Sequence, residues 1–310
     1  MDALNSAVPV EPGSADGFSR GASWAVPGAV TRPVLRWHGG KWMLAPWIIS
    51  HFPAHRVYVE PFGGAASVLL RKPRAYAEVY NDLDDDVVNL FRVLRGSVAA
   101  SNELHHRLLL TPFARAEFDD AYLPTGDPIE RARRLIIRSF MGFGSDGHNG
   151  ARPTGFRANS HRSGTTPAHD WRNYTDCLEP IMARLAGICV EHRPAIEVMA
   201  QQDSPETLHY VDPPYVHSTR STAKNSTRKN YAHEMNDDQH SDLLAFLQTL
   251  QGMVVLSGYP NALYDGALPG WRRVERDALA DGARPRTEVL WLNRACVEAL
   301  GHGPLFEIAA

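Results

Sequence analysis

The segment Asp212-Pro213-Pro214-Tyr215 combines residue types that are well suited to chemistry. It follows a strand-like run at 208–211, and α/β sheets place reactive groups at the ends of their strands. Two consecutive prolines remove two backbone donors and stiffen the loop, which leaves carbonyls free to accept hydrogen bonds. The same residues would also suit a rigid turn without a function, so the rest of the chain has to decide between the two interpretations.

A carboxylate beside a free carbonyl suits the amino group of a nucleobase. Such an amine is a poor nucleophile because its lone pair is delocalised into the ring. Asp212 and the Pro213 carbonyl would each accept one N–H and localise that lone pair, while the Tyr215 ring stacks on the base. Methyl transfer can then occur by direct displacement, helped by positioning. Methylation at cytosine C5 would instead need a thiolate, typically after a proline, and none of the three cysteines follows one.

A second segment, Glu60-Pro61-Phe62-Gly63-Gly64, ends another strand-like run and is suited to a nucleoside ligand. Glycines let the backbone approach the ligand closely. Asp82 lies 18 residues after Gly64, just past the next strand-like run, where a carboxylate can accept hydrogen bonds from ribose hydroxyls. The GxGxxG spacing that dinucleotides need is absent. A ligand without phosphate is therefore favoured, and S-adenosylmethionine, with S-adenosylhomocysteine as product, fits that description.

Upstream, Trp37-His38-Gly39-Gly40-Lys41 is a glycine pair between an aromatic residue and a lysine. It is not a Walker A loop. It is either an ordinary turn or a turn whose backbone and Lys41 close over the methionine end of the cofactor. The predicted cofactor-binding residues are thus Trp37, Gly39, Gly40, Lys41, Glu60, Pro61, Phe62, Gly63, Gly64, Asp82 and Asp212.

The order of elements predicts one α/β domain with an insertion. Strand-like runs at 56–60 and 77–80 flank a predicted helix start that extends through Leu70, which gives a βαβ unit. Further strand-like runs at 187–191, 208–211, 252–257 and 287–292 alternate with helical stretches such as 237–250. We expect a flexible tail at 1–30, an α/β domain from 31–91 and 176–310, and a mainly helical insertion at 92–175.

The charge is uneven, although the net charge is only −3. Residues 131–175 hold eight arginines and two acids, and 216–231 hold four basic residues and no acid. Two such runs beside the predicted chemistry favour a nucleic-acid contact over solvated surfaces. The predicted DNA-binding residues are Arg138, Asn149, Arg152, Arg157, Arg220, Lys224, Arg228 and Lys229. No metal site or membrane span is expected, and we favour a cytoplasmic monomer.

In this arrangement the chain resembles the Dam-type family of DNA adenine-N6 methyltransferases over about residues 33–295. The segments at 37–41 and 60–64, Asn81-Asp82 and the 212–215 segment resemble its cofactor and catalytic motifs. Two further stretches, 231–235 and 256–259, resemble a phage and prophage branch. The resemblance implies a Rossmann-like S-adenosylmethionine-dependent fold, double-stranded DNA as partner and a target-recognition role for the insertion. Pro194 stands where the family often has an Asp that binds the cofactor's adenine.

Alternatives remain open at this point. The same chemistry would serve cytosine N4, or an amino group in RNA or protein, although Asp212 in the first position favours adenine. A DNA-binding regulator without activity would be expected to have a damaged cofactor site, and Lys41, Asp82 and Asp212 are present. A kinase or dehydrogenase on a similar sheet would need a phosphate-binding spacing that the chain lacks.

Overall fold

In the part of the chain that the structure describes, seven strands form one mixed sheet in the order β3-β2-β1-β4-β5-β7-β6. The computed structural model describes residues 29–144, 154–158, 164–216, 234–279 and 285–301. The strands are β1 (Val57–Glu60), β2 (Ala77–Asn81), β3 (Cys189–Glu191), β4 (Thr207–Val211), β5 (Met253–Gly258), β6 (Arg272–Leu279) and β7 (Pro285–Leu292). All pairings are parallel except those of β7, which is antiparallel to both β5 and β6.

The strand order reverses between β1 and β4. The chain passes outward from β1 to β2 and β3, then returns to the other side of β1 to form β4 and β5. At such a reversal the loops that follow the two strands diverge, and open α/β sheets bind ligands in the resulting crevice. The glycine turn at 60–64 follows β1 and the 212–215 segment follows β4. The topology thus brings the two predicted motifs to one edge of the sheet.

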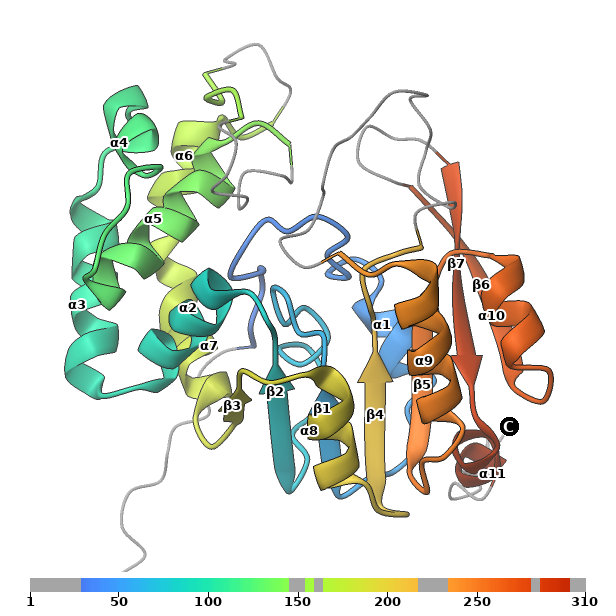
Figure 1. Cartoon of the computed structure of the whole chain (residues 1–310). Helices are drawn as coiled ribbons and strands as arrows, with labels where there is room; N and C mark the ends of the chain where they lie inside the picture. The colour runs from blue at the N-terminus through green and yellow to red at the C-terminus, as the bar shows by residue number, and fades with distance from the viewer. Residues whose placement is uncertain (1–28, 145–153, 159–163, 217–233, 280–284, 302–310) are drawn as a thin grey trace, which may run out of the picture.

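Helices flank the sheet and build a second lobe beside it (Figure 1). In the view of Figure 1, α8, α9 and α10 lie in front of the sheet, and α1 lies behind it. The helices are α1 (Ala45–Ile49), α2 (Asp85–Arg95), α3 (Val98–Leu110), α4 (Arg115–Asp120), α5 (Pro128–Met141), α6 (Pro167–Arg172), the 3₁₀ turn η2 (Thr175–Cys177), α7 (Leu178–Leu185), α8 (Ala195–Gln202), α9 (Asp237–Leu247), α10 (Ala262–Ala267) and α11 (Arg294–Gly301).

Helix α2 connects the sheet to the helical lobe. Asp84 caps it by accepting hydrogen bonds from the amides of Asp86 and Val87, and acids in its first turn and arginines in its last complement the helix dipole. Its apolar face packs against α3, α5 and α7. The expected domain boundary at 91/92 falls inside this helix, which continues to Arg95, so the helical lobe is joined to the sheet by a continuous helix.

The structure differs from the sequence analysis in two further places. Residues 65–70 form hydrogen-bonded turns and not the predicted helix start, because Ala66 takes a positive φ of 52° that a helix does not allow. Strand β6 was not predicted from the sequence. Its charged residues, such as Arg273 and Glu275, hide the alternation of a buried strand, since β6 is an edge strand paired only with β7 among the described residues.

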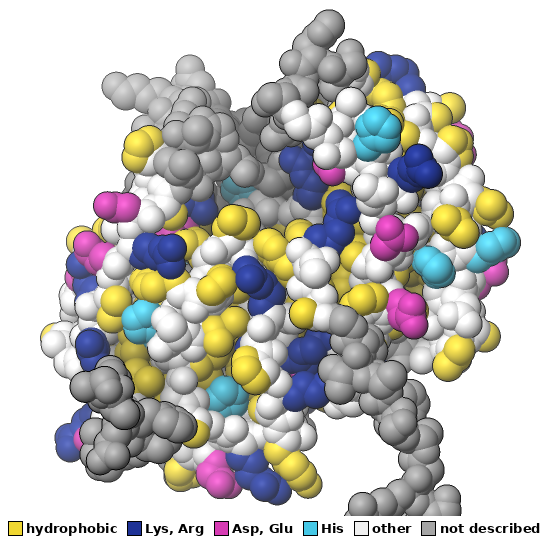
Figure 2. All heavy atoms as spheres, turned by 180° about the vertical axis from the view of Figure 1, so that it is seen from behind, with side chains coloured by type: hydrophobic (Ala, Val, Ile, Leu, Met, Phe, Trp, Pro, Cys, Tyr) yellow, Lys and Arg dark blue, Asp and Glu magenta, His cyan; other side chains and the backbone are white. Residues whose placement is uncertain are grey.

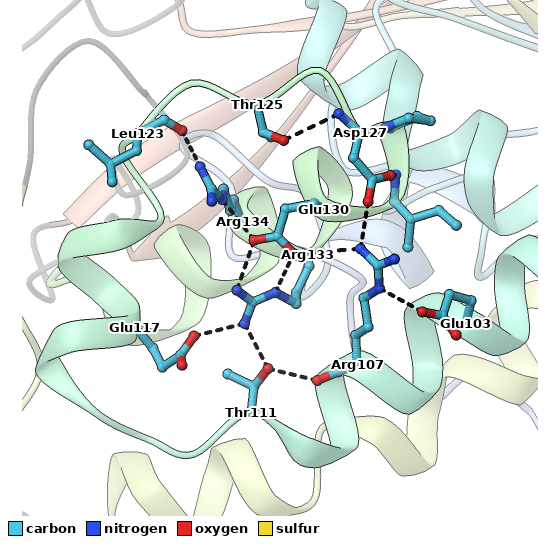
Figure 3. Close-up of polar contacts among 12 residues, drawn as sticks. Glu103, Arg107, Thr111, Glu117, Leu123, Thr125, Asp127, Glu130, Arg133 and Arg134 are labelled. Carbon is cyan, nitrogen blue, oxygen red and sulfur yellow. Dashed lines mark hydrogen bonds and ion pairs between the residues drawn. The ribbon is translucent and has the colours of Figure 1, made fainter.

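The arginines of the helical lobe are largely paired inside the lobe (Figure 3). Arg133 donates to Glu130 and Glu117, and Arg134 donates to Glu130 and to the carbonyl of Leu123. Seen from behind, dark blue Lys and Arg side chains lie scattered among other residue types (Figure 2). For Arg133 and Arg134, the positive charge counted in the sequence is therefore offset by carboxylates of the same lobe.

Arg138 and Arg157, two predicted DNA contacts, are buried. Arg138 donates to the Ala121 carbonyl at 2.8 Å and pairs with Asp86 at 2.7 Å. Arg157 donates to the Phe140 carbonyl at 3.0 Å. Charged groups are buried only when they are paired in this way, and here the pairs hold the lobe together. Both side chains are thus engaged inside the lobe, and their contact with DNA stays a prediction.

No described helix is long and apolar enough to cross a membrane.

Arg138→Met should destabilise the protein, because the substitution keeps apolar length but leaves Asp86 with one guanidinium partner fewer. We expect the free energy of unfolding to fall by about 2 kcal/mol, measured by urea denaturation followed by circular dichroism. Arg172→Met is the matched control, since Arg172 is exposed on α6. Equal losses in the two variants would contradict the role given to Arg138.

Candidate active site

A cavity of about 400 Å³ lies at the edge of the sheet where β1, β2 and β4 end. Its walls come from the 37–41 turn, the loops after these three strands, and the beginnings of α8 and α9. All of the residues predicted for cofactor binding or catalysis line it, namely Trp37, Gly39, Gly40, Lys41, Glu60, Pro61, Phe62, Gly63, Gly64, Asp82, Asp212, Pro213, Pro214 and Tyr215. Motifs far apart in the sequence thus share one cavity.

Lys41 contacts the 212–215 segment directly. Its Nζ lies 2.8 Å from Asp212 Oδ2, hydrogen bonds to the Tyr215 hydroxyl, and donates to the Gly39 carbonyl at 3.0 Å. The ammonium also lies 4.6 Å from the centre of the Tyr215 ring, within the range of a cation–π contact. Lys41 is 3% exposed. This buried cation therefore fixes the 37–41 turn to the end of β4.

Asp212 uses one carboxylate oxygen for this ion pair and keeps the other available. Burial raises the pKa of Asp212, and the Lys41 ammonium opposes that rise. Oδ2 faces Lys41, whereas the buried Oδ1 has no hydrogen-bond partner among the residues that the structure describes. A buried acceptor without a partner is costly. A donor that reached this oxygen would remove that cost, and Asp212 as a residue lines the cavity.

The glycine turn after β1 is packed so tightly that side chains would not fit. A Cβ on Gly63 would come within 2.1 Å of the Tyr80 ring, and one on Gly64 within 2.7 Å of the Trp37 indole nitrogen. Gly64 also has a positive φ of 47°. The Tyr80 hydroxyl donates to the Gly64 carbonyl at 2.6 Å. Both glycines are therefore needed to let β2 and the 37–41 turn close against the loop after β1.

Asp82 shapes the same turn from the end of β2. Its Oδ2 accepts a hydrogen bond from the Gly64 amide at 2.7 Å, and its Oδ1 accepts one from the Asp84 amide at 2.8 Å. Burial raises the pKa of Asp82, and the two amides oppose the rise. Each carboxylate oxygen can accept a second hydrogen bond, so Asp82 can hold the turn and still accept a hydroxyl from a ligand.

Glu60 and Asp212, at the ends of β1 and β4, and Glu288, within β7, bring three carboxyl groups to this part of the sheet. Side chains two residues apart share a face of a strand, and Tyr58, Tyr210 and Leu290 show that this face packs on the core cluster that includes α1. Glu60 accepts hydrogen bonds from the Tyr58 hydroxyl at 2.7 Å and the Leu69 amide at 3.0 Å. Burial raises its pKa to about 8, and the Asp212 charge adds to this rise.

Sequence reasoning missed Glu288, Arg286 and Tyr259. Tyr215 donates from its hydroxyl to Glu288 at 3.2 Å, Arg286 pairs with Glu288 at 3.0 Å, and the rings of Tyr215 and Tyr259 lie 4.2 Å apart. The available signal was an Arg-Thr-Glu alternation at the start of the 287–292 run, which puts two charges on one face of a strand.

The cavity also takes residues that were not predicted from α8, from α9 and from the segment just before α9, among them Ile196, Asp242 and Met235. Pro194, which stands at the position where a family Asp is expected, lines the cavity and caps α8 through backbone groups only. The remaining predicted DNA contacts lie outside the described residues, and they are Asn149, Arg152, Arg220, Lys224, Arg228 and Lys229.

Glu60→Gln should remove a pH dependence of stability. The folded-state pKa of Glu60 is about 8, above its ordinary value of 4.5, so the folded protein holds the proton more tightly than the unfolded chain. The free energy of unfolding of the unmodified protein should therefore fall as pH rises from 4.5 to about 8, by up to about 1.4 kcal/mol per pH unit. Urea unfolding across that range would measure the slope. The slope should be shallower in Glu60→Gln and unchanged in Glu206→Gln, an exposed control.

Part of the chain is similar in sequence to a known family and to several named proteins. A family model described as the D12 class N6 adenine-specific DNA methyltransferase matches residues 37–137, a range that includes the 37–41 and 60–64 segments and ends before the 212–215 segment. Three relatives carry the name DNA adenine methylase. The one from Serratia marcescens is 38% identical over 64 residues, 21% of this chain and 23% of the relative. That of Vibrio cholerae (classical Ogawa strain) is 28% identical over 193 residues, 59% and 65%. That of Escherichia coli K12 is 28% identical over 116 residues, 36% and 41%.

The chain thus spans between 23% and 65% of the length of these curated relatives. The residues that carry the cofactor motifs lie inside the family match, and the structure brings the 212–215 segment against them. The family match and the named relatives show that this part of the chain is similar to the D12 class N6 adenine-specific DNA methyltransferases.

Proposed function

We propose that the protein transfers the methyl group of S-adenosylmethionine to N6 of an adenine rotated out of double-stranded DNA. The observation that carries this proposal is Asp212, which lines the cavity beside Pro213 and whose buried Oδ1 has no described hydrogen-bond partner. An exocyclic amine offers two N–H donors in a plane. One can bond to Asp212 Oδ1 and the other to the Pro213 carbonyl, which localises the nitrogen lone pair.

The charges around the cavity fit a cationic ligand. Six of the described residues that line it carry carboxyl groups, namely Glu60, Asp82, Asp84, Asp212, Glu234 and Asp242. Lys41 is the only lysine or arginine among them. Such a lining would repel the pyrophosphate of a dinucleotide and attract a sulfonium and an ammonium group. This balance of charge supports S-adenosylmethionine over a phosphate-bearing cofactor.

The residues that would hold the cofactor follow from their positions. Asp82 can accept ribose hydroxyls while it keeps its two backbone hydrogen bonds. The close packing at Gly63 and Gly64 leaves backbone, not side chains, at that wall. Phe62 and Ile196 offer apolar contacts to a purine. S-adenosylmethionine supplies an electrophilic methyl group on sulfur when it is bound. The chain's own part is to bind, orient and exclude water.

Lys41 and Tyr215 prepare the acceptor. The ion pair with Lys41 opposes the rise that burial causes in the pKa of Asp212, which keeps the carboxylate available as an acceptor. The hydroxyl of Tyr215 is held at Lys41 and Glu288, so its ring is fixed beside the cavity, where a base can stack on it. Rotation of a base out of duplex DNA costs a few kcal/mol, which contacts elsewhere must offset. Residues of the two basic runs are the proposed source of those contacts, with 92–175 as the target-recognition region.

Cytosine N4 is the second candidate substrate, because its amine offers the same two donors. Asp212 in the first position and the D12 class family match favour adenine. A DNA substrate would place the protein in the cytoplasm.

Asp212→Asn should abolish most of the methylation. The amide nitrogen that replaces one carboxylate oxygen cannot accept an N–H, and the ion pair with Lys41 is lost. We expect the rate of methyl transfer to fall at least about a hundredfold. Long-read modification sequencing of plasmid DNA from expressing cells would detect the product base and its sequence context.

The matched control is Asp238→Asn, since Asp238 is exposed in the first turn of α9. It should keep the modification pattern of the unmodified protein. Modified cytosine in place of adenine would favour the second candidate. Absence of any modified base with the unmodified protein would refute the proposed function.

Asp82→Asn should weaken cofactor binding more than it weakens folding. An amide nitrogen at this position would face the Gly64 or the Asp84 amide and would supply one acceptor oxygen where the carboxylate supplies two. We expect the affinity for S-adenosylmethionine to fall on the order of tenfold to a hundredfold, measured by isothermal titration calorimetry. Asp85→Asn, exposed at the start of α2, is the control. Tighter binding of NAD than of S-adenosylmethionine would contradict the assignment of the cofactor.

A further inference from the structure

Glu288 is a charged residue in the interior of the sheet that the proposed reaction does not use directly. It lies on β7, and its side chain is 1% exposed. Burial raises its pKa, and Lys41 and Arg286 oppose that rise. Burying a carboxylate in a sheet is costly unless both oxygens are engaged. Here Oε2 accepts from the Tyr215 hydroxyl at 3.2 Å and Oε1 faces Arg286 Nε at 3.0 Å.

These contacts connect the ion pair between Lys41 and Asp212 to β7, in the antiparallel part of the sheet. The series runs from Asp212 through Lys41 and Tyr215 to Glu288 and Arg286, so positive and negative groups alternate around one tyrosine hydroxyl. The groups come from three segments. Lys41 belongs to the 37–41 turn, Asp212 and Tyr215 to the 212–215 segment, and Arg286 and Glu288 to β7. Tyr215 is thus held at its hydroxyl from two sides, by Lys41 and by Glu288.

Arg286 extends the arrangement to a second aromatic ring. It donates to the Tyr259 hydroxyl, and its guanidinium lies 5.3 Å from the centre of that ring. Tyr259 in turn packs on Tyr215 with ring centres 4.2 Å apart at 47°. A ring that is held at its hydroxyl and against its face has little freedom to tilt. The β7 pair Arg286 and Glu288 therefore restrains both tyrosine rings.

We propose that Glu288 is a positioning residue for methyl transfer, which holds the Tyr215 hydroxyl and, through it, Lys41, so that Asp212 Oδ2 stays paired and Oδ1 is left to accept from the base. This inference rests on the proposed function. Glu288 itself does not line the cavity and contacts neither the base nor the cofactor site. Its hydrogen bond to the 212–215 segment is the one that it accepts from the Tyr215 hydroxyl.

A double-mutant cycle with Glu288→Gln and Tyr215→Phe tests this. Glutamine has one acceptor oxygen and one amide donor, so it cannot accept from Tyr215 and face Arg286 with oxygen at the same time. Tyr215→Phe keeps the ring and removes the hydroxyl. We expect each single variant to lower kcat on the order of tenfold, with KM for DNA changed much less, and the double variant to be no slower than the slower single variant.

Two measurements separate positioning from loss of structure. Thermal unfolding and the calorimetric affinity for S-adenosylmethionine should stay close to those of the unmodified protein in Glu288→Gln. Glu275→Gln on β6 is the matched control, since Glu275 is 47% exposed and pairs with Arg273. It should leave kcat unchanged.

The outcomes are distinct. Unmodified protein that methylates no DNA would refute the proposed function before the cycle begins. Active protein in which the two substitutions multiply their effects, or in which Glu288→Gln has full activity, would refute the role of Glu288. A fall in cofactor affinity or in unfolding temperature that accounts for the loss of rate would show that Glu288 serves the fold alone.

Discussion

The ion pair between Lys41 and Asp212 joins two segments that are distant in the sequence and adjacent at the sheet edge. Burial alone would favour the neutral carboxylic acid at Asp212, and the ammonium at 2.8 Å opposes this. The pair occupies one oxygen of Asp212 and leaves the other without a described hydrogen-bond partner. The lysine also contacts Tyr215, so one cation determines the charge of the acceptor and the position of the ring. Without it, the cavity would hold carboxyl groups and no lysine or arginine among its described lining residues.

Much of the site could be predicted from local sequence signals, each of which has one physical cause. Six of the seven strands were anticipated, because buried parallel strands read as short runs of β-branched and aromatic residues, and the glycine turn and the two prolines mark loops that approach a ligand. The spacing from Gly64 to Asp82 predicted their neighbourhood, and the structure joins the two by a hydrogen bond. These signals are local, and each can be recognised without knowledge of the partner residues.

The signals that failed are those that depend on distant partners. An arginine has the same appearance in the sequence whether it faces solvent or a carboxylate, so Arg138 and its pairing with Asp86 could not be read from charge counts. The same holds for Glu288, whose importance comes from Tyr215 and Arg286 on other parts of the sheet edge or strand. Residues 65–70 were misread because apolar periodicity does not reveal a positive φ such as that of Ala66.

Helix α2 has a mechanical consequence for the whole molecule. Asp82, at the cavity, and Asp86, which holds Arg131 and Arg138 of the helical lobe, lie on either side of the Asp84 cap. A displacement of Asp82 would thus reach α5 through the Asp84 cap and the ion pairs of Asp86 with Arg131 and Arg138. If occupation of the cavity displaces Asp82, the free-energy change is shared between the two lobes, and linkage requires that a ligand on the helical lobe alter affinity at the cavity by the same factor.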